Sequence, residues 1–284
     1  MKPVKSIHNI EAEAILHNVE SDSTSRKVVR ISEQVAIGGI KLALMAGPCS
    51  VESEEQFYAA ALAARDNGAT VIRGGIFKPR TSPYSFQGLG STGYRILDEV
   101  RNNLKLPVVS EIMDVRLVDE MAPHVDIFQV GTRNMYNYPL LKELGKLNKP
   151  VLLKRAMMAT VDEFIGAAEY LLSHGNGNVI LCERGIRSFD SSTRFCLDLT
   201  VIPVLRERTN LPIIVDPSHG TGVARYVEPM SLAAVAAGAD GLLIEVHAKP
   251  DQALSDGKQS LSFDELHSLS DRIIKVANAV GRAF

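Results

Sequence analysis

The sequence predicts an α/β protein, a (β/α)8 barrel (TIM barrel) with a short N-terminal extension. Short apolar runs rich in β-branched residues alternate along the chain with amphipathic segments of helical period. The runs are apolar on both faces, which is typical of parallel strands that helices cover. Eight such units occur, and eight is the number that closes a parallel sheet into this barrel.

The expected strands are the apolar runs themselves. They lie at residues 42–46, 70–77, 107–113, 127–132, 150–157, 179–183, 212–216 and 241–247. Between them, alanine and leucine recur at three- and four-residue steps, as in residues 54–67 and 161–174, which predicts helices that face a core. Glycine-containing turns precede the second and the eighth runs, where the preceding helices should end.

Residues 1–36 fall outside this repeating pattern. They are polar, and residues 21–25, a run of serine, aspartate and threonine, are typical of a flexible or hairpin segment. We therefore expect two parts, a short extension over residues 1–36 and a catalytic barrel over residues 37–284. A chain of 284 residues has the normal length for one such barrel, so its length requires no second domain.

Composition excludes several classes of function. The formal net charge of -2 excludes a basic field that would attract nucleic acid or an anionic membrane. No stretch approaches a transmembrane span, and the N-terminus lacks the apolar core of a signal peptide. Three cysteines without regular spacing exclude a disulfide framework and suit a reducing compartment. We expect a cytoplasmic protein that binds neither nucleic acid nor membranes.

Polar residues gather where the predicted strands end, which is the face of such a barrel that carries its chemistry. The seventh run leads into the sequence Asp-Pro-Ser-His-Gly, which places His219 in a glycine-rich loop as a candidate metal ligand or proton carrier. Cys49 follows the first run, Glu245 lies near the end of the last one, and Asp256 lies beyond it. Gathered in space, side chains of these types would form a site for one divalent metal ion.

Cations also gather at the strand ends, in a chain that is acidic overall. They are Arg73, Lys78, Arg80, Arg133, Lys154, Arg155 and Arg184. Cations at buried positions need anionic partners, and phosphate or carboxylate ligands supply these through charge-assisted bonds. The expected ligand is therefore a small molecule with several negative charges, and two phosphates fit better than one.

Each of these residues also has a structural explanation. Cys49 would then be a packed small hydrophobe, and His219 a hydrogen-bonded histidine. Cations at strand ends can close the barrel mouth as ion-pair partners, with Glu111 and Glu183 as their carboxylates. His247 is expected to point away from the mouth. The functional interpretation depends on the conjunction of cysteine, histidine, carboxylates and cations on one rim.

Four motifs in the chain identify a family. They are Ala46-Gly47-Pro48-Cys49-Ser50, Lys78-Pro79-Arg80-Thr81-Ser82, Asp216-Pro217-Ser218-His219-Gly220 and the ending Glu245…Asp256-Gly257. In this order they resemble 3-deoxy-D-arabino-heptulosonate 7-phosphate (DAHP) synthase, in the branch that also resembles 3-deoxy-D-manno-octulosonate 8-phosphate (KDO8P) synthase. The resemblance covers roughly residues 40–270. KDO8P enzymes have Lys-Ala-Asn-Arg-Ser in place of Lys-Pro-Arg-Thr-Ser, so the second motif favours DAHP synthase.

The resemblance implies a transferase that condenses phosphoenolpyruvate with D-erythrose 4-phosphate and water to DAHP and phosphate, the first step of the shikimate pathway. In the family a divalent metal is held by four side chains, which carry over to Cys49, His219, Glu245 and Asp256. A thiolate with an imidazole and two carboxylates suits Mn, Fe, Co or Zn and disfavours a purely Mg site. The family also implies a homotetramer or a homodimer.

The resemblance implies substrate contacts as well. Those to phosphoenolpyruvate carry over to Arg73, Lys78, Arg133, Lys154 and Arg184, and those to erythrose 4-phosphate to Arg80, Thr81 and Ser82. Lys154 and Glu111 are our candidates for positioning and deprotonating the attacking water, and Lys78 completes the predicted catalytic set. Because roughly 36 residues are too few for a regulatory domain, we expect an enzyme without one that is insensitive to aromatic amino acids.

Alternative functions stay open. A KDO8P synthase that uses arabinose 5-phosphate would share the mechanism, and a metal-free Schiff-base aldolase would use Lys154 as its nucleophile. A non-catalytic phosphate-binding barrel would have no need for the metal-binding residues. For the metal-free enzyme we expect Cys49 to be prone to oxidation, because neighbouring cations would lower the pKa of its thiol.

Overall fold

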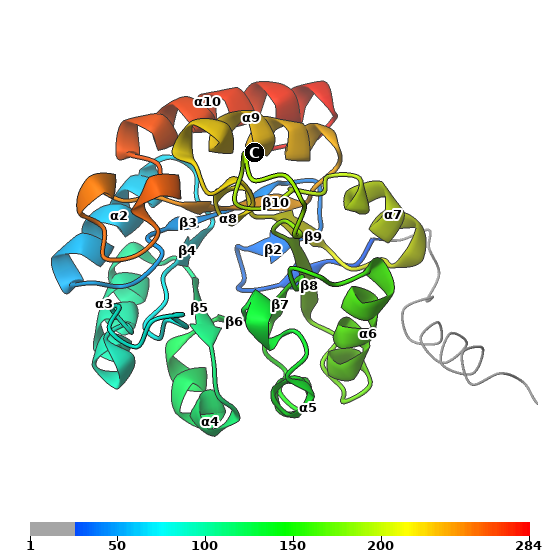
Figure 1. Ribbon diagram of the computed structural model, residues 1–284, viewed down its shortest axis with the longest axis horizontal. Coiled ribbons are helices and arrows are strands. Elements are labelled where there is room, and N and C mark those ends of the chain that lie inside the picture. The colour runs from blue at the N-terminus through cyan, green and yellow to red at the C-terminus, as the bar shows by residue number, and fades with distance from the viewer. Residues whose placement is uncertain (1–25) are drawn as a thin grey trace, which may run out of the picture.

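The computed structural model describes residues 26–284, in which eight parallel strands close into a barrel that helices surround (Figure 1). The barrel strands are β3 (Ala43–Gly47), β4 (Val71–Arg73), β5 (Val108–Ile112), β6 (Ile127–Val130), β7 (Val151–Lys154), β8 (Val179–Glu183), β9 (Ile213–Val215) and β10 (Gly241–Glu245). Each strand pairs with the next one along the chain, and β10 closes the ring on β3. The predicted (β/α)8 fold is confirmed.

Helices follow the strands and cover the outside of the barrel (Figure 1). They are α2 (Glu54–Asp66), α3 (Gly93–Leu104), α4 (Val118–Met121), α5 (Tyr138–Gly145), α6 (Val161–Leu172), α7 (Val201–Arg208), α8 (Pro217–Thr221), α9 (Ala224–Ala236) and α10 (Phe263–Ala279). Thr160 and Ser262 begin α6 and α10 with capping boxes, in which the hydroxyl and a glutamate three residues later satisfy free backbone N–H groups. None of the helices in the described part combines the length and apolarity needed to span a bilayer.

Several strands are shorter than the apolar runs that predict them. The largest difference concerns the second run, which predicts a strand to residue 77, whereas β4 ends at Arg73. Gly74 packs so closely on Phe57 that a Cβ atom there would lie 2.5 Å from the ring. Gly75 still pairs with Ser50, and beyond it the chain carries Lys78 into the central cavity, while Ile76 stays buried in the core. In the sequence, buried apolar residues that follow the end of a strand cannot be distinguished from a continuation of that strand.

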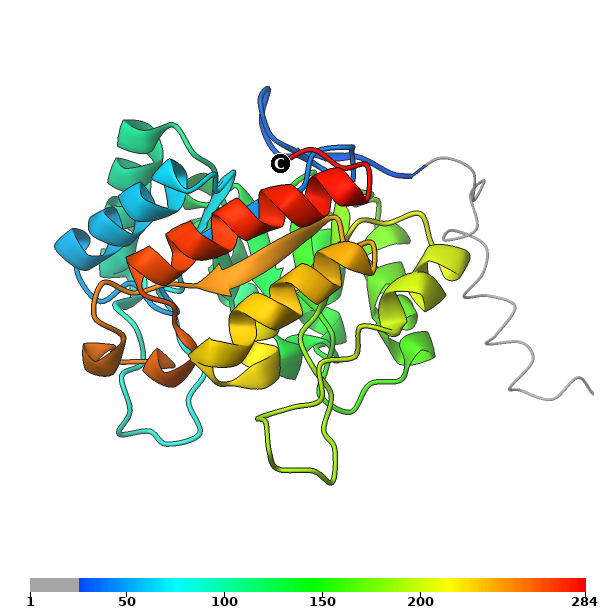
Figure 2. The same cartoon turned by 90° about the horizontal axis from the view of Figure 1, so that it is seen from above.

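An antiparallel hairpin, β1 (Val29–Arg30) with β2 (Ala36–Ile37), closes one end of the barrel. Val29 and Ile37 are fully buried and join the apolar side chains inside the barrel, such as Met45 and Ile127. Figure 2 shows the hairpin and the C-terminus at the end of the barrel opposite to the long loops that follow β4 and β8. The segment at residues 21–25, predicted to be a flexible or hairpin segment, lies outside the described residues.

Candidate active site

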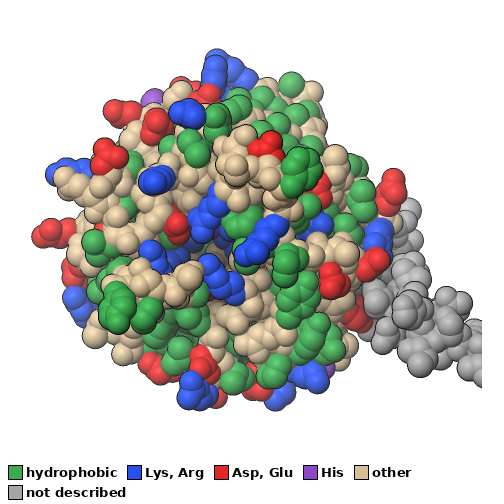
Figure 3. Space-filling model, in the orientation of Figure 1, with side chains coloured by type: hydrophobic (Ala, Val, Ile, Leu, Met, Phe, Trp, Pro, Cys, Tyr) green, Lys and Arg blue, Asp and Glu red, His purple; other side chains and the backbone are tan. Residues whose placement is uncertain are grey.

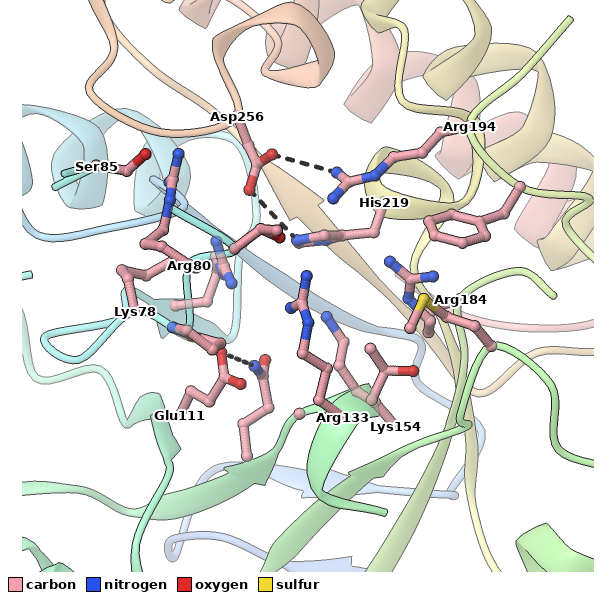
Figure 4. A pocket seen from close by; sticks show the side chains of 18 of the residues that line it. Lys78, Arg80, Ser85, Glu111, Arg133, Lys154, Arg184, Arg194, His219 and Asp256 are labelled. Atoms are coloured by element: carbon pink, nitrogen blue, oxygen red, sulfur yellow. Dashed lines mark hydrogen bonds and ion pairs between the residues drawn. The ribbon is translucent and has the colours of Figure 1, made fainter. Parts of the chain in front are cut away.

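The open end of the barrel contains a cavity of about 280 Å³ at the carboxyl ends of the strands. Its charged lining residues are Arg73, Lys78, Arg80, Glu111, Arg133, Lys154, Arg184, Arg194, His219 and Asp256. Figure 3 shows the lysine and arginine side chains gathered in this central hollow, and Figure 4 shows them directed into it. Seven cations face two carboxylates, so the cavity is strongly positive although the chain as a whole is not.

Four side chains of metal-binding types meet beside this cavity. Cys49, His219, Glu245 and Asp256 each contribute one ligand atom, and these atoms all lie within 4.8 Å of one another. Barrel closure explains why the two ends of the sequence meet here, since β10 pairs with β3 and places Glu245 opposite Gly47. His219 reaches the same place because α8 begins directly after β9.

Asp216 orients the imidazole ring of His219. Oδ2 of Asp216 lies 2.8 Å from Nδ1 of His219, while Nε2 faces Glu245 at 3.4 Å and Asp256 at 3.9 Å. Burial lowers the pKa of His219 below its ordinary value, although Asp216 and Glu245 oppose this shift. A neutral ring whose Nδ1 proton faces Asp216 leaves the Nε2 lone pair directed at the cluster, which is the form that binds a metal.

Both oxygens of the Glu245 carboxylate accept hydrogen bonds from neighbouring side chains. Oε1 accepts a hydrogen bond from Nη1 of Arg73 at 2.7 Å, and Oε2 accepts one from Nε2 of Gln259 at 2.6 Å. Burial disfavours the charge on this carboxylate, but His219 and Arg73 outweigh burial and hold the pKa of Glu245 below its ordinary value. The group is therefore ionised at neutral pH and available as a ligand.

Asp256 is held in place by the loop that carries it. Its backbone is left-handed, with φ 52°, a conformation that is uncommon for residues other than glycine and is found at functional sites. Ser255 Oγ lies 2.5 Å from Ser50 Oγ, and the backbone N–H of Leu254 donates to Oε1 of Glu52 at 2.8 Å. These bonds fasten the Asp256 loop to the loop that follows β3, and so to Cys49.

The Cys49 side chain is buried, and its Sγ donates to Oδ2 of Asp256 at 3.0 Å. Burial raises the pKa of the Cys49 thiol to about 12, and the Glu245 carboxylate adds to the increase. Lys78 and Arg73 lower this pKa, as the sequence leads one to expect, but their effect is smaller than that of burial. The expectation of a depressed pKa in the metal-free protein is therefore wrong.

The donor set fits a divalent metal ion. Ligand atoms that bind one ion at about 2.0–2.3 Å can be separated by at most about 4.6 Å. The observed limit of 4.8 Å thus requires only a small adjustment of the side chains. Sulfur, imidazole nitrogen and carboxylate oxygen together favour a borderline metal, and binding would displace the thiol proton.

Lys154 and Lys78 are buried in the wall of the cavity. Nζ of Lys154 donates to Oδ2 of Asp216 at 2.5 Å, and Nζ of Lys78 donates to the backbone oxygen of Cys49 at 3.3 Å. Burial works against the charge of Lys78, but the Cys49 and Glu111 side chains overcome it and raise the pKa of this lysine. Lys78 is therefore a charged donor within the cavity.

Glu111 reaches the cavity from β5. Its Oε2 accepts a long hydrogen bond from Nε2 of Gln129 on β6, at 3.4 Å. Gly131 makes room for the carboxylate, because a Cβ atom at that position would lie 1.9 Å from Oε1 of Glu111. The carboxylate occupies a space that only a glycine at residue 131 leaves open.

The residues predicted to bind substrates all line the cavity. They are Arg73, Lys78, Arg80, Thr81, Ser82, Arg133, Lys154 and Arg184. Within residues 26–284, neither Arg80 nor Arg133 forms an ion pair, and Arg184 packs on the Phe195 ring at 4.2 Å from its centroid. Cations that converge on a cavity without carboxylate partners are suited to an anionic ligand.

Arg155 is different from the other strand-end cations. Its Nη1 donates to Glu183 at 3.0 Å and to Asp198 at 2.9 Å, and the residue does not line the cavity. Arg155 and Glu183 thus form the structural ion pair that the sequence leaves open as an alternative. His247 also lies away from the cavity, with its Nε2 3.4 Å from Oε2 of Glu52.

Two residues of the site are not predicted from the sequence. Arg194, in the loop after β8, lines the cavity and forms an ion pair with Asp256 at 3.2 Å. Its signal is a loop that begins at a strand end and contains further arginines, Arg184 and Arg187. Gln259, bonded to Glu245, has no comparable signal in the sequence.

Comparison with known proteins places the chain among two groups of related enzymes. A phospho-2-dehydro-3-deoxyheptonate aldolase of Thermotoga maritima is 47% identical over 247 residues, which cover 87% of this chain and 73% of the relative. A 2-dehydro-3-deoxyphosphooctonate aldolase of Geobacter sulfurreducens is 32% identical over 271 residues, which cover 86% of this chain and 97% of that relative.

Solved structures agree with the sequence relatives. The crystal structure of the DAHP synthase from Thermotoga maritima matches with a TM-score of 0.88 and 45% identity, covering 91% of this chain and 76% of that one. A truncated form of 3-deoxy-D-arabino-heptulosonate 7-phosphate synthase from the same organism matches with a TM-score of 0.88 and 40% identity, covering 95% and 99% of the two chains. The sequence profile of the DAHP synthetase I family matches residues 22–281. With this cavity and these relatives, the chain belongs to the DAHP synthetase I family.

Proposed function

We propose that the cavity is the place where this chain, as a DAHP synthase, joins phosphoenolpyruvate to D-erythrose 4-phosphate and water and releases phosphate. The family match and the 47% identity to a heptonate aldolase support this activity, the first step of the shikimate pathway. The octonate aldolase of Geobacter sulfurreducens, at 32% identity, is more distant, which argues against the KDO8P alternative.

The observation that carries the proposal is that two binding features share one cavity. Cations without ion-pair partners within the described residues, among them Arg80 and Arg133, suit two phosphorylated reactants. The four metal-binding side chains lie beside them. A barrel that only bound phosphate would need the first feature and not the second.

We assign the metal site to Cys49, His219, Glu245 and Asp256. A divalent ion bound there would act as a Lewis acid on the aldehyde of the sugar phosphate. The sulfur ligand favours Mn, Fe, Co or Zn over Mg.

The cations of the cavity divide between the two substrates in our proposal. The carboxylate and phosphate of phosphoenolpyruvate bind Arg73, Lys78, Arg133, Lys154 and Arg184, while the phosphate of the sugar binds Arg80, Thr81 and Ser82. These charge-assisted bonds hold the enol carbon against the aldehyde, and this orientation lowers the entropic part of the barrier. In Figure 4, Arg133 and Lys154 point into the centre of the cavity, where the two substrates would meet.

In our proposal, Lys154 and Glu111 position and deprotonate the attacking water. The enol electron pair forms the new carbon–carbon bond, which leaves positive character at the carbon that carries the phosphate. Water adds to that carbon and gives up one proton, and phosphate departs with its bonding electrons as the second water proton leaves and the ketone forms. The oxygen of the former aldehyde takes up a proton and becomes a hydroxyl. Glu111 has a carboxylate in the cavity that can accept the proton, and Lys154 is a donor that can hold the water oxygen.

The contacts of Lys154 disfavour the Schiff-base alternative. A nucleophilic lysine must be a neutral amine, whereas Nζ of Lys154 lies 2.5 Å from the buried carboxylate of Asp216. This contact engages the Nζ group that would have to attack the substrate carbonyl. Borohydride should therefore trap no adduct between the protein and either substrate.

A two-substrate assay tests the proposed function. Consumption of phosphoenolpyruvate is followed with erythrose 4-phosphate and, separately, with arabinose 5-phosphate, each in the presence of excess Mn²⁺. We expect the higher kcat/KM with erythrose 4-phosphate. A higher value with arabinose 5-phosphate would establish the octonate alternative, and no turnover with either would contradict both.

We also propose that the chain forms a homotetramer or homodimer and works in the cytoplasm, which agrees with its three unpaired cysteines. Light scattering on the purified protein tests the first proposal. Residues 1–36 would form the short extension and residues 37–284 the catalytic barrel, with the β1–β2 hairpin as the plug of its closed end.

A further inference from the structure

A chain of hydrogen bonds connects the two carboxylates of the proposed metal site. Nε2 of Gln259 donates to Oε2 of Glu245 at 2.6 Å, and Oε1 of Gln259 accepts from Nη1 of Arg194 at 3.0 Å. The same Nη1 donates to Oδ1 of Asp256 at 3.2 Å. The connection therefore runs from Glu245 through one amide and one guanidinium to Asp256.

The amide of Gln259 meets the hydrogen-bonding requirement of its place in this chain. An ionised carboxylate such as Glu245 only accepts hydrogen bonds, and a guanidinium such as Arg194 only donates them. The group between them must donate on one side and accept on the other. This requirement fixes which way the amide points, because the reversed orientation would set oxygen against oxygen and nitrogen against nitrogen.

The position of Gln259 is strongly constrained. Its side chain is buried, with 2% of the residue exposed. Because water does not reach the amide, losing either hydrogen bond would leave a buried polar group unpaired and cost free energy. Gln259 belongs to the short helical turn Gly257–Gln259 that follows Asp256 directly. A Cβ atom on Gly257 would lie 2.1 Å from the backbone oxygen of Pro250, so this turn requires glycine.

Arg194 is held from the opposite side. A Cβ atom on Gly222 would lie 2.5 Å from Cβ of Arg194, so the glycine leaves the space that this arginine uses. Figure 4 shows the guanidinium of Arg194 directed at Asp256, across from the ring of His219. With Oδ1 of Asp256 engaged in this way, Oδ2 faces Cys49 at 3.0 Å.

We propose that Gln259 and Arg194 are positioning residues of the metal site, which orient the carboxylates of Glu245 and Asp256 toward a bound ion. The inference depends on the proposed metal site at Cys49 and His219. Neither residue touches the ion in this assignment. Each acts through a carboxylate that would otherwise rotate, as the hydrogen-bond partners behind metal ligands commonly do.

Binding of Mn²⁺ to the full chain tests the inference without any measurement of activity. Gln259→Met keeps the side-chain length and removes both hydrogen bonds, and we expect the Kd for Mn²⁺ to rise by about 10–100-fold. Arg194→Met should raise the Kd in the same direction, and Arg194→Lys, which keeps a donor and the charge, should recover part of the loss. The double variant should lose less than the sum of the two single losses in free energy, because both act on one chain of bonds.

Two further measurements separate positioning from a merely structural role. Cd²⁺ added to Gln259→Met should still give the near-ultraviolet thiolate band of Cys49, but only at higher Cd²⁺ concentration than in the wild type. The increase in Tm that Mn²⁺ adds to the metal-free protein should shrink in the same variant, since stabilisation by a ligand follows its Kd. Gln252→Met is the matched control, because Gln252 lies in the same loop with an exposed side chain.

Unchanged Mn²⁺ affinity in Gln259→Met would overturn the inference. If the Tm of the metal-free variant fell as well, Gln259 would have a structural role only. Cys49→Ser identifies the other kind of failure. If it binds Mn²⁺ as tightly as the wild type, the proposed metal site is itself wrong and the positioning role falls with it. If it loses Mn²⁺ while Gln259→Met does not, the metal site stands and only the role of Gln259 is refuted.

Discussion

Asp216 holds Lys154 through a bond of 2.5 Å between Oδ2 and Nζ, and the same oxygen lies 2.8 Å from Nδ1 of His219. One buried carboxylate therefore connects a proposed catalytic lysine with a proposed metal ligand. Burial opposes the charge on Asp216, but His219 and Lys154 hold its pKa well below the ordinary range. The proposed metal ligand His219 and Lys154, which is proposed to position the water, thus both depend on one ionised group.

Asp216→Asn should weaken metal binding and slow turnover. The amide keeps the shape but removes the charge, and its N–H₂ group can pair with the wrong tautomer of His219. We expect the Kd for Mn²⁺ to rise and kcat/KM to fall, each by roughly 10–100-fold. Equilibrium dialysis and steady-state assays measure the two effects. A variant that lost activity with unchanged Mn²⁺ affinity would show that Asp216 does not orient His219.

Gly131→Ala should displace Glu111 without affecting metal binding. The added Cβ atom would lie 1.9 Å from Oε1 of Glu111, so the carboxylate has to move. A displacement of about 1 Å in a catalytic group costs on the order of 100-fold in rate, and we expect kcat to fall by about this factor. Steady-state kinetics at saturating Mn²⁺ provide the measurement.

Gly166→Ala is the matched control for this substitution. Gly166 lies within α6, and no atom lies within 4 Å of a Cβ built there. Alanine in a helix interior is more favourable than glycine by roughly 0.5–1 kcal/mol, so the control should be at least as stable as the wild type and fully active. Full activity in Gly131→Ala as well would remove Glu111 from the mechanism.

Arg80→Ala should change the KM values for the two substrates to different extents. Arg80 has no ion-pair partner within residues 26–284, so its loss leaves no buried carboxylate unpaired. A hydrogen bond to a charged group contributes about 1.5–3 kcal/mol, which corresponds to an increase of roughly 10–100-fold in the KM for erythrose 4-phosphate. The KM for phosphoenolpyruvate should change much less. Equal increases in both values would refute the assigned sugar-phosphate contact.

Cys49 in the metal-free protein should react slowly with iodoacetamide at neutral pH. Burial raises the pKa of the Cys49 thiol to about 12, so the nucleophilic thiolate is scarce at pH 7 and becomes abundant only in strongly alkaline solution. Cys196 is exposed and provides the comparison within the same chain. Mass spectrometry of timed samples measures both rates. Labelling of Cys49 as fast as that of Cys196 would show that the buried thiol is ionised.

The sequence predicts the barrel well because its evidence is local. Apolar runs and helical periods are set by which faces are buried, and eight of them leave little choice of fold. The same logic fails at the strand ends, where β4 ends at Arg73 although Ile76 remains buried. Burial is visible in the pattern of residue types, whereas the direction of the backbone is not.

The candidate site is predictable to the extent that it consists of strand ends. Cys49 and His219 lie within four residues of the ends of β3 and β9, so barrel geometry brings them to one rim. Gln259 is different, because it resembles the exposed Gln252 in the same loop and acquires its contacts only when the loop folds. The pKa of Cys49 is also a three-dimensional property, since the sequence shows neighbouring cations but not the loss of water around the thiol.

The central claim is that Cys49, His219, Glu245 and Asp256 hold a divalent metal that turnover requires. The most direct measurement is consumption of phosphoenolpyruvate with erythrose 4-phosphate after chelator treatment and again after addition of Mn²⁺, in the wild type and in Cys49→Ser. We predict that the chelator abolishes turnover and that Mn²⁺ restores it in the wild type alone. Wild-type turnover by chelator-treated Cys49→Ser would contradict the claim.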